Sequence, residues 1–240
     1  MLAPVKRLTH SQIVWLSTQR CKKHGHSFLE HWSCYERNPP KDSPLLKKEE
    51  QERVGFLDIE AEDLNADYGI IFNWCLLDAQ TNKIHRDIIT PRDIKKYPSK
   101  ERNKMPTEDT RIIQSLVKLL GGYDRIIGHY SCRYDVPFVR TRAVMCGVPF
   151  PHYGLLYQTD TWVILKNKFK LSRNSLQNST LKLLGVTRKD HLSLSIKHGC
   201  LRGEKWALET SDAHCEKDVL DLRDLYNKIH PFARKTKSSI

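Results

Sequence analysis

VGFLDIEA, residues 54–61, is the stretch of this sequence that decides its fold. Its pattern is typical of a β-strand, in which successive side chains point to opposite faces of the sheet. Asp58 and Glu60 therefore share one face, while Leu57 and Ile59 share the other. Two carboxylates so close together repel each other unless a cation or a proton intervenes. The stretch predicts either a strand that helps to hold a divalent metal ion or an edge strand with a solvated acidic face.

The sequence around this strand predicts an α/β domain, a mixed sheet with helices packed on it. Apolar and β-branched runs predict further strands at 68–79, 83–90, 123–130 and 155–165. Short connections among the first three strands favour an antiparallel meander. Helical spacing, caps and glycine stops predict helices at 107–120 (with Thr107 as N-cap), 135–147, 175–184 and 210–229.

Composition divides the chain into four segments. Residues 1–38 form a Cys/His-rich N-terminal module, which contains a short amphipathic helix at 9–20. Residues 39–52 are rich in proline and charge and poor in periodic apolar residues, which is typical of a linker. The α/β domain is expected over 53–232, and a basic tail follows at 233–240.

Bulk composition favours a folded protein with a polyanionic partner. Hydrophobic residues make up 39% of the 240 residues, and the net charge is +12. The positive charge favours nucleic acid, although it could also serve solubility alone. No apolar run is long enough to span a bilayer and the first residues are too polar for a signal peptide, which predicts an intracellular, cytoplasmic location. The seven cysteines are then expected to be reduced thiols or metal ligands.

Two further groups of residues are candidates for the same site as Asp58 and Glu60. His214 and Asp218 are four residues apart on the last predicted helix and so lie on one helical face, although such pairs are common on helix surfaces. Asp135 stands where a predicted strand has ended and a helix begins, where aspartate is also a preferred N-cap.

The order of these motifs resembles a known family. D-I-E on a first strand, Y-D-V-P-F before a helix and H-x-x-x-D-V on a C-terminal helix resemble the three motifs of the DEDD (DnaQ-like) 3′–5′ exonucleases. The sequence is most similar to the YprB-type ribonuclease H-like group, including members found in phages. In the Tyr-type branch of the family, a tyrosine stands four residues before the last aspartate. Here His214 takes that position relative to Asp218.

The resemblance implies a ribonuclease H-like fold and hydrolysis of DNA or RNA, from a 3′ end or a single-stranded region, to nucleoside 5′-monophosphates. It implies two Mg²⁺ or Mn²⁺ ions held by Asp58, Glu60, Asp135 and Asp218, with Asp58 as the candidate bridging ligand. His214 would accept the proton of the attacking water, and Asp160 would be a supporting residue. A structure-selective endonuclease and a nucleic-acid-binding module that no longer cuts remain alternatives.

The N-terminal module contains a separate cluster of candidate metal ligands. Cys21, His24, His26, His31 and Cys34 lie within 14 residues and could hold one tetrahedral Zn²⁺. Five side chains compete for four positions, and the preferred set is Cys21, His26, His31 and Cys34. A plain polar surface and a basic loop that contacts phosphate are the alternatives.

Overall fold

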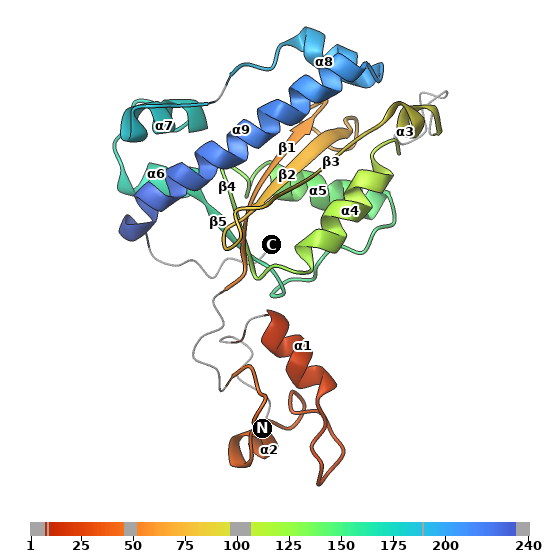
Figure 1. Cartoon of the computed structure of the whole chain (residues 1–240), viewed down its shortest axis with the longest axis vertical. Coiled ribbons are helices and arrows are strands. Elements are labelled where there is room, and N and C mark those ends of the chain that lie inside the picture. The colour runs from red at the N-terminus through yellow and green to blue at the C-terminus, as the bar shows by residue number, and fades with distance from the viewer. Residues whose placement is uncertain (1–7, 9, 46–51, 97–106, 189, 234–240) are drawn as a thin grey trace.

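The computed structural model describes residues 8, 10–45, 52–96, 107–188 and 190–233. It contains a small N-terminal module and a larger α/β domain, which lie at opposite ends of the long axis in Figure 1. The strands are β1 Val54–Ala61, β2 Ile71–Asp78, β3 Ile84–Ile88, β4 Arg125–Gly128 and β5 Tyr157–Asp160. The helices are α1 His10–Thr18, α2 Trp32–Arg37, α3 Pro91–Lys96, α4 Thr110–Leu120, α5 Asp135–Met145, α6 Thr161–Lys168, α7 Leu176–Leu184, α8 Leu194–Leu201, α9 Lys205–Ile229 and the 3-10 helix η2 His230–Phe232.

The five strands form one mixed sheet in the order β3-β2-β1-β4-β5. β1 pairs antiparallel with β2, and β2 pairs antiparallel with β3, as the predicted meander requires. β4 pairs parallel with both β1 and β5. Parallel neighbours need crossover connections, which α4 and α5 provide in the chain order. β1 is therefore the central strand, where the antiparallel and parallel parts of the sheet meet.

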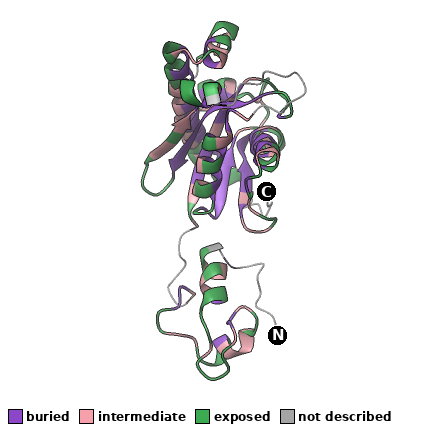
Figure 2. Cartoon of the chain, turned by 90° about the vertical axis from the view of Figure 1, so that its right-hand side faces the viewer, coloured by how far each residue is buried: buried purple, intermediate pink, exposed green. Residues whose placement is uncertain are grey.

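Helices cover both faces of this sheet, and β1 contributes to the core on each face. Leu57 and Ile59 pack in a cluster with buried residues of α4 and α5, whereas Phe56 packs in a second cluster with buried residues of α9. Figure 2 shows buried residues concentrated in the strands and the helix surfaces that face them. The odd and even positions of β1 thus face different helices, and the face that carries Asp58 and Glu60 is the one that α9 covers.

The structure corrects several predicted boundaries. The predicted strand 155–165 is wrong beyond Asp160, because α6 begins at Thr161 and continues to Lys168. The helix predicted from Thr107 begins at Thr110, with Asp109 at its N-cap. The last helix begins at Lys205, five residues before its predicted start at 210, and the short helices α2, α3 and α8 were not predicted. Local apolar runs such as TWVIL do not distinguish a buried helix from a strand.

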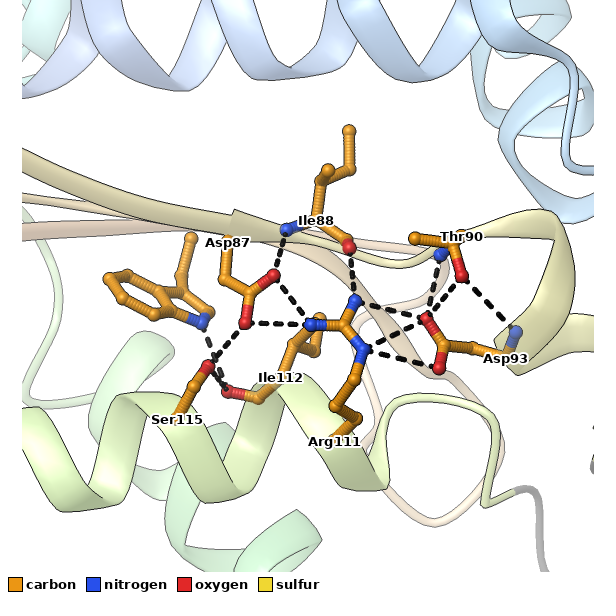
Figure 3. A network of polar contacts seen from close by, with 8 residues as sticks. Asp87, Ile88, Thr90, Asp93, Arg111, Ile112 and Ser115 are labelled. Atoms are coloured by element: carbon orange, nitrogen blue, oxygen red, sulfur yellow. Dashed lines mark hydrogen bonds and ion pairs between the residues drawn. The ribbon is translucent and has the colours of Figure 1, made fainter.

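A polar network fixes the edge of the sheet to α4 (Figure 3). The Arg111 guanidinium donates to both carboxylate oxygens of Asp87, at 2.7 and 2.9 Å, and to the Ile88 carbonyl at 2.6 Å. It also donates to Asp93, at the start of α3, with distances of 3.0 and 3.2 Å. One arginine on α4 therefore holds the end of β3 and the beginning of α3 together.

The N-terminal module has a small core of its own. Among the described residues, its buried apolar side chains are Leu8, Leu16, Phe28 and Tyr35. They pack against partly buried neighbours that include Leu45, which lies in the segment predicted as linker. Of the predicted linker at 39–52, residues 46–51 lie outside the described residues, and so does the predicted tail from 234 onward. Within the described ranges, no helix combines the length and the apolar character needed to cross a bilayer.

Candidate functional site

The acidic pair of β1 lies on the side of the sheet that α9 covers. Asp58 and Glu60 are both partly buried, while Leu57 and Ile59 on the other face are 2% and 4% exposed. Glu60 stands opposite Asn73 on β2. The alternation predicted from the sequence is therefore present, and the solvated edge strand that was its alternative is excluded because β1 has a neighbour on both sides.

Contacts on either side of His214 fix the position of α9 against the sheet. Ser211, about one turn earlier, donates its hydroxyl to Asn73 Oδ1 at 2.6 Å. Cys215, the residue after His214, donates its thiol to the Asp58 carbonyl at 3.3 Å. These two contacts join α9 to β2 and β1, so the rotation of the helix about its own axis is set at this level.

With the helix held in this position, His214 and Asp218 face Glu60. His214 Nε2 lies 3.4 Å from Glu60 Oε1 and 3.8 Å from Asp218 Oδ2. His214 and Asp218 are only 5% and 2% exposed, so neither belongs to a solvated helix surface. One ligand atom from each of Glu60, His214 and Asp218 lies within 4.8 Å of the other two.

Asp135 reaches the same region from the first residue of α5. Its Oδ1 accepts a hydrogen bond from the Ile59 backbone N–H, between Asp58 and Glu60, at 3.3 Å. Burial, together with the charges of Asp160 and Glu60, raises the pKa of the Asp135 carboxyl to about 7. Burial also raises the pKa of the neighbouring Tyr134 hydroxyl, and the charges of Asp135, Glu60 and Asp58 add to that rise.

These side chains fit divalent cations by their chemistry. Carboxylate oxygens are the ligands that Mg²⁺ and Mn²⁺ prefer. Of the four predicted acids, Glu60 and Asp218 lie in one group with His214, and Asp135 contacts the β1 backbone between Asp58 and Glu60. Burial is the main cause of the raised pKa of Asp135, and repulsion by the charges of Asp160 and Glu60 adds to it. A divalent cation would remove that repulsion and allow all the carboxyls to ionise together.

Asp160 shapes the loop that leads into Asp135. Its carboxylate accepts hydrogen bonds from the backbone N–H groups of Tyr130 at 2.9 Å, Cys132 at 3.0 Å and Trp162 at 2.9 Å. The same loop requires a glycine at position 128, because a Cβ there would lie 2.2 Å from Ser131 Oγ. Asp160 therefore contacts the backbone of the loop that leads to the start of α5.

Asp190 is a member of this site that the sequence analysis missed. It lies in the segment between α7 and α8, and its Oδ1 is 2.5 Å from His214 Nδ1. Its other oxygen accepts from Lys217 Nζ at 2.5 Å, and these two contacts lower the pKa of Asp190 to about 2. No local pattern marks this aspartate, because only the tertiary fold brings it to α9.

The Cys/His cluster of the N-terminal module is also brought together. Ligand atoms of Cys21, His24, His26 and Cys34 all lie within 4.8 Å of one another. This group contains His24 where the preferred set had His31. His31 nevertheless lies close by, with Nδ1 3.4 Å from Cys34 Sγ. The cluster is distinct from the acidic site, which is formed by β1, α5 and α9.

Comparisons with known proteins agree with the observed architecture. The family B DNA polymerase from the hyperthermophilic archaeon Pyrobaculum calidifontis is similar in structure, with a TM-score of 0.53 and 16% sequence identity. The similarity covers 75% of this chain and 25% of the polymerase, so the chain spans about a quarter of the polymerase's length. No curated protein matches the sequence.

The sequence profile of the RNase H superfamily matches residues 55–230. The matched region extends from the second residue of β1 to just past the end of α9, so it includes nearly the whole sheet. The match confirms the ribonuclease H-like fold expected from the motifs. Because it covers well over half of the sequence, the chain belongs to the RNase H superfamily.

Proposed function

We propose that this protein is a metal-dependent 3′–5′ exonuclease that hydrolyses the phosphodiester bonds of DNA or RNA to nucleoside 5′-monophosphates. The observation that carries the proposal is the convergence of Glu60, His214 and Asp218 within 4.8 Å, with Asp135 bonded to the strand between Asp58 and Glu60. Membership of the RNase H superfamily supports nuclease-type activity on nucleic acid. The net charge of +12 supports the same class of partner, because it favours the approach of a polyanion.

The four carboxylates would hold a pair of Mg²⁺ or Mn²⁺ ions, with Asp58 as the bridging ligand. Such ions, when bound, stabilise charge on the attacking and leaving oxygens of a phosphodiester. Asp135 and Asp218 are almost fully buried, so the protein excludes water from one side of the site and strengthens its electrostatic interactions there. Glu60 lies beside His214 and would keep the imidazole close to the reacting phosphate.

His214 would accept the proton of the attacking water, and Asp190 would hold the imidazole in the form that can do so. An ionised carboxylate can only accept hydrogen bonds, so the short contact with Asp190 requires the proton of His214 on Nδ1. In the neutral ring the lone pair is then on Nε2, the nitrogen that faces Glu60 and Asp218. His214 is thus oriented as a base toward the carboxylate cluster.

Degradation of end-labelled strands tests the proposal. Single- and double-stranded DNA and RNA, labelled at either end, are incubated with the full chain in Mg²⁺, in Mn²⁺ or in chelator. We expect immediate release of a 3′ label as mononucleotide, progressive shortening of 5′-labelled strands, and no reaction in chelator. Early internal cuts would show an endonuclease instead, and a gel shift without cleavage would show a module that binds and does not cut.

Replacing Asp190 with asparagine is expected to lower kcat by about 10- to 100-fold with little change in KM. An asparagine can donate to Nδ1 and so leave the proton on Nε2, which removes part of the 10²- to 10⁴-fold that a general base contributes. Steady-state rates on a labelled strand give the two constants. Asp190→Glu, which keeps the acceptor, should recover much of the activity.

The loss of kcat caused by Asp190→Asn should disappear in a protein that lacks the His214 imidazole. In the His214→Ala background, adding Asp190→Asn should change the rate no further, because residues that act through one another are not additive. An equal loss from Asp190→Asn in both backgrounds would contradict a positioning role and indicate only structural damage to the α7–α8 segment.

A further inference from the structure

We propose that the N-terminal module binds one structural Zn²⁺ through Cys21, His24, His26 and Cys34. All four ligand atoms lie within 4.8 Å of one another, and three sulfur–nitrogen distances are close to the edge of a zinc tetrahedron. His24 Nδ1 lies 3.3 Å from Cys34 Sγ and 3.7 Å from Cys21 Sγ, and His26 Nε2 lies 3.6 Å from Cys34 Sγ. With zinc bonds of about 2.3 Å to sulfur and about 2.0 Å to nitrogen, the sulfur–nitrogen edge of a tetrahedron is about 3.5 Å.

The local backbone forms a hairpin that brings three of these ligands close together. Cys21 N donates to the His26 carbonyl at 2.9 Å, and Arg20 and Ser27 form an isolated antiparallel bridge just outside this pair. Between them the chain reverses at Gly25, which has a φ of +74° that side chains other than glycine's rarely adopt. Three ligands therefore come from one tight hairpin, and Cys34 comes from α2.

The size of the module gives a physical reason for a metal. Among the described residues, its buried apolar core consists of four side chains, Leu8, Leu16, Phe28 and Tyr35. Segments shorter than about 40 residues rarely bury enough apolar surface to fold without a metal, a disulfide or a partner. Cys21 and Cys34 are both free thiols in the structure, so no disulfide takes that role. A zinc ion would link the hairpin to α2 and so add the missing stability.

Donor chemistry separates this site from the acidic one. Thiolate and imidazole ligands favour Zn²⁺, whereas the carboxylates near α9 favour Mg²⁺ or Mn²⁺. His31 Nδ1 lies 3.0 Å from His26 Nε2 and 3.4 Å from Cys34 Sγ. His31 is nevertheless left out of the ligand set, because the group whose ligand atoms all lie within 4.8 Å of one another is Cys21, His24, His26 and Cys34. The zinc site does not depend on the proposed nuclease function, because it shares no residue with that site.

Metal analysis of the purified full chain tests the proposal. We expect one Zn²⁺ per chain in the wild type, and a loss to well below half of that in Cys34→Ser and in His24→Ala. His31→Ala and Cys146→Ser should keep the full amount, the latter as a matched control that removes a thiol outside the module. Asp58→Ala should also keep it, which separates this site from the acidic site whatever the outcome for nuclease activity.

Cobalt substitution of the wild-type chain gives a second readout that needs no variant to fold. Bound Co²⁺ should show the thiolate charge-transfer absorption in the near ultraviolet, and one equivalent of Zn²⁺ should remove it. A wild-type chain that holds no zinc and shows no cobalt–thiolate absorption would overturn the proposal. Loss of zinc in Asp58→Ala together with its retention in Cys34→Ser would also overturn it. Retention of zinc in His24→Ala together with its loss in His31→Ala would overturn the proposed ligand set.

Discussion

Asp58→Ala is expected to lower the rate of nucleic-acid degradation by about a thousandfold or more. Asp58 is the proposed bridging ligand, and loss of a carboxylate that holds the cations removes several kcal/mol of transition-state stabilisation, at about 1.4 kcal/mol per tenfold in rate. Asp218→Ala should have a similar effect, because its carboxylate lies almost fully buried beside His214 and Glu60. Initial rates on a labelled strand, with Mg²⁺ or Mn²⁺ present, measure both losses.

His214→Ala should leave more activity than either aspartate variant. A general base contributes about 10²- to 10⁴-fold, and the cations would still be held by the carboxylates. Glu216→Gln is the matched control, since Glu216 lies on the same helix between His214 and Asp218 but pairs with Arg86 of β3 at 2.7 Å. Wild-type degradation by Asp58→Ala protein would rule out the proposed site, and a large loss in Glu216→Gln would show that the helix surface itself is sensitive.

The second large effect is expected on stability. Arg142→Met should lower the free energy of unfolding by about 3–5 kcal/mol, because it leaves the Asp109 carboxylate buried without its cation. Both side chains of this ion pair are 0% exposed, and the guanidinium donates to Asp109 Oδ1 at 2.5 Å and Oδ2 at 2.9 Å. Denaturant unfolding followed by circular dichroism gives the change in free energy.

This pair also bears on the candidate site, since it fixes the helix that begins with Asp135. Arg142 on α5 donates to the Ala66 carbonyl at 3.2 Å, and Asp109 accepts from the Ile71 backbone N–H at 3.0 Å. The ion pair therefore joins α5 to the N-cap of α4 and the start of β2. Arg140→Met, on the exposed side of the same helix, is the control and should cost about 1 kcal/mol at most. A similar small loss in Arg142→Met would contradict the stabilising role assigned to the buried pair.

The sequence by itself determined the type of fold and most of its elements. The two-residue alternation of 54–61 is a local property, and it was sufficient to place Asp58 and Glu60 on one face, opposite Leu57 and Ile59. The four-residue spacing of His214 and Asp218 likewise sets them on one face of a helix. Such periodicities follow from backbone geometry, so they can be read before any tertiary contact is known.

Local patterns were insufficient where the environment decided the outcome. TWVIL has the composition of a strand, yet it forms part of α6, because Asp160 caps a helix there by accepting from Trp162 N and ends β5. Spacing alone also gave no basis for choosing four of the five Cys and His side chains in the N-terminal module. The proximity of His24 to Cys21 and Cys34 depends on a hairpin that turns at Gly25.

Only the tertiary structure decided which residues complete the candidate site. Asp190 is 24 residues from His214 and follows no repeating pattern, so its contact with the imidazole arises from the path of the chain between α7 and α8. The raised pKa of Asp135 depends in the same way on burial and on charges from other elements. Secondary-structure periodicity is encoded in neighbouring residues, whereas a cluster of charges depends on packing between distant segments. The sequence therefore predicted the fold class and the candidate acids, but not the contact between Asp190 and His214.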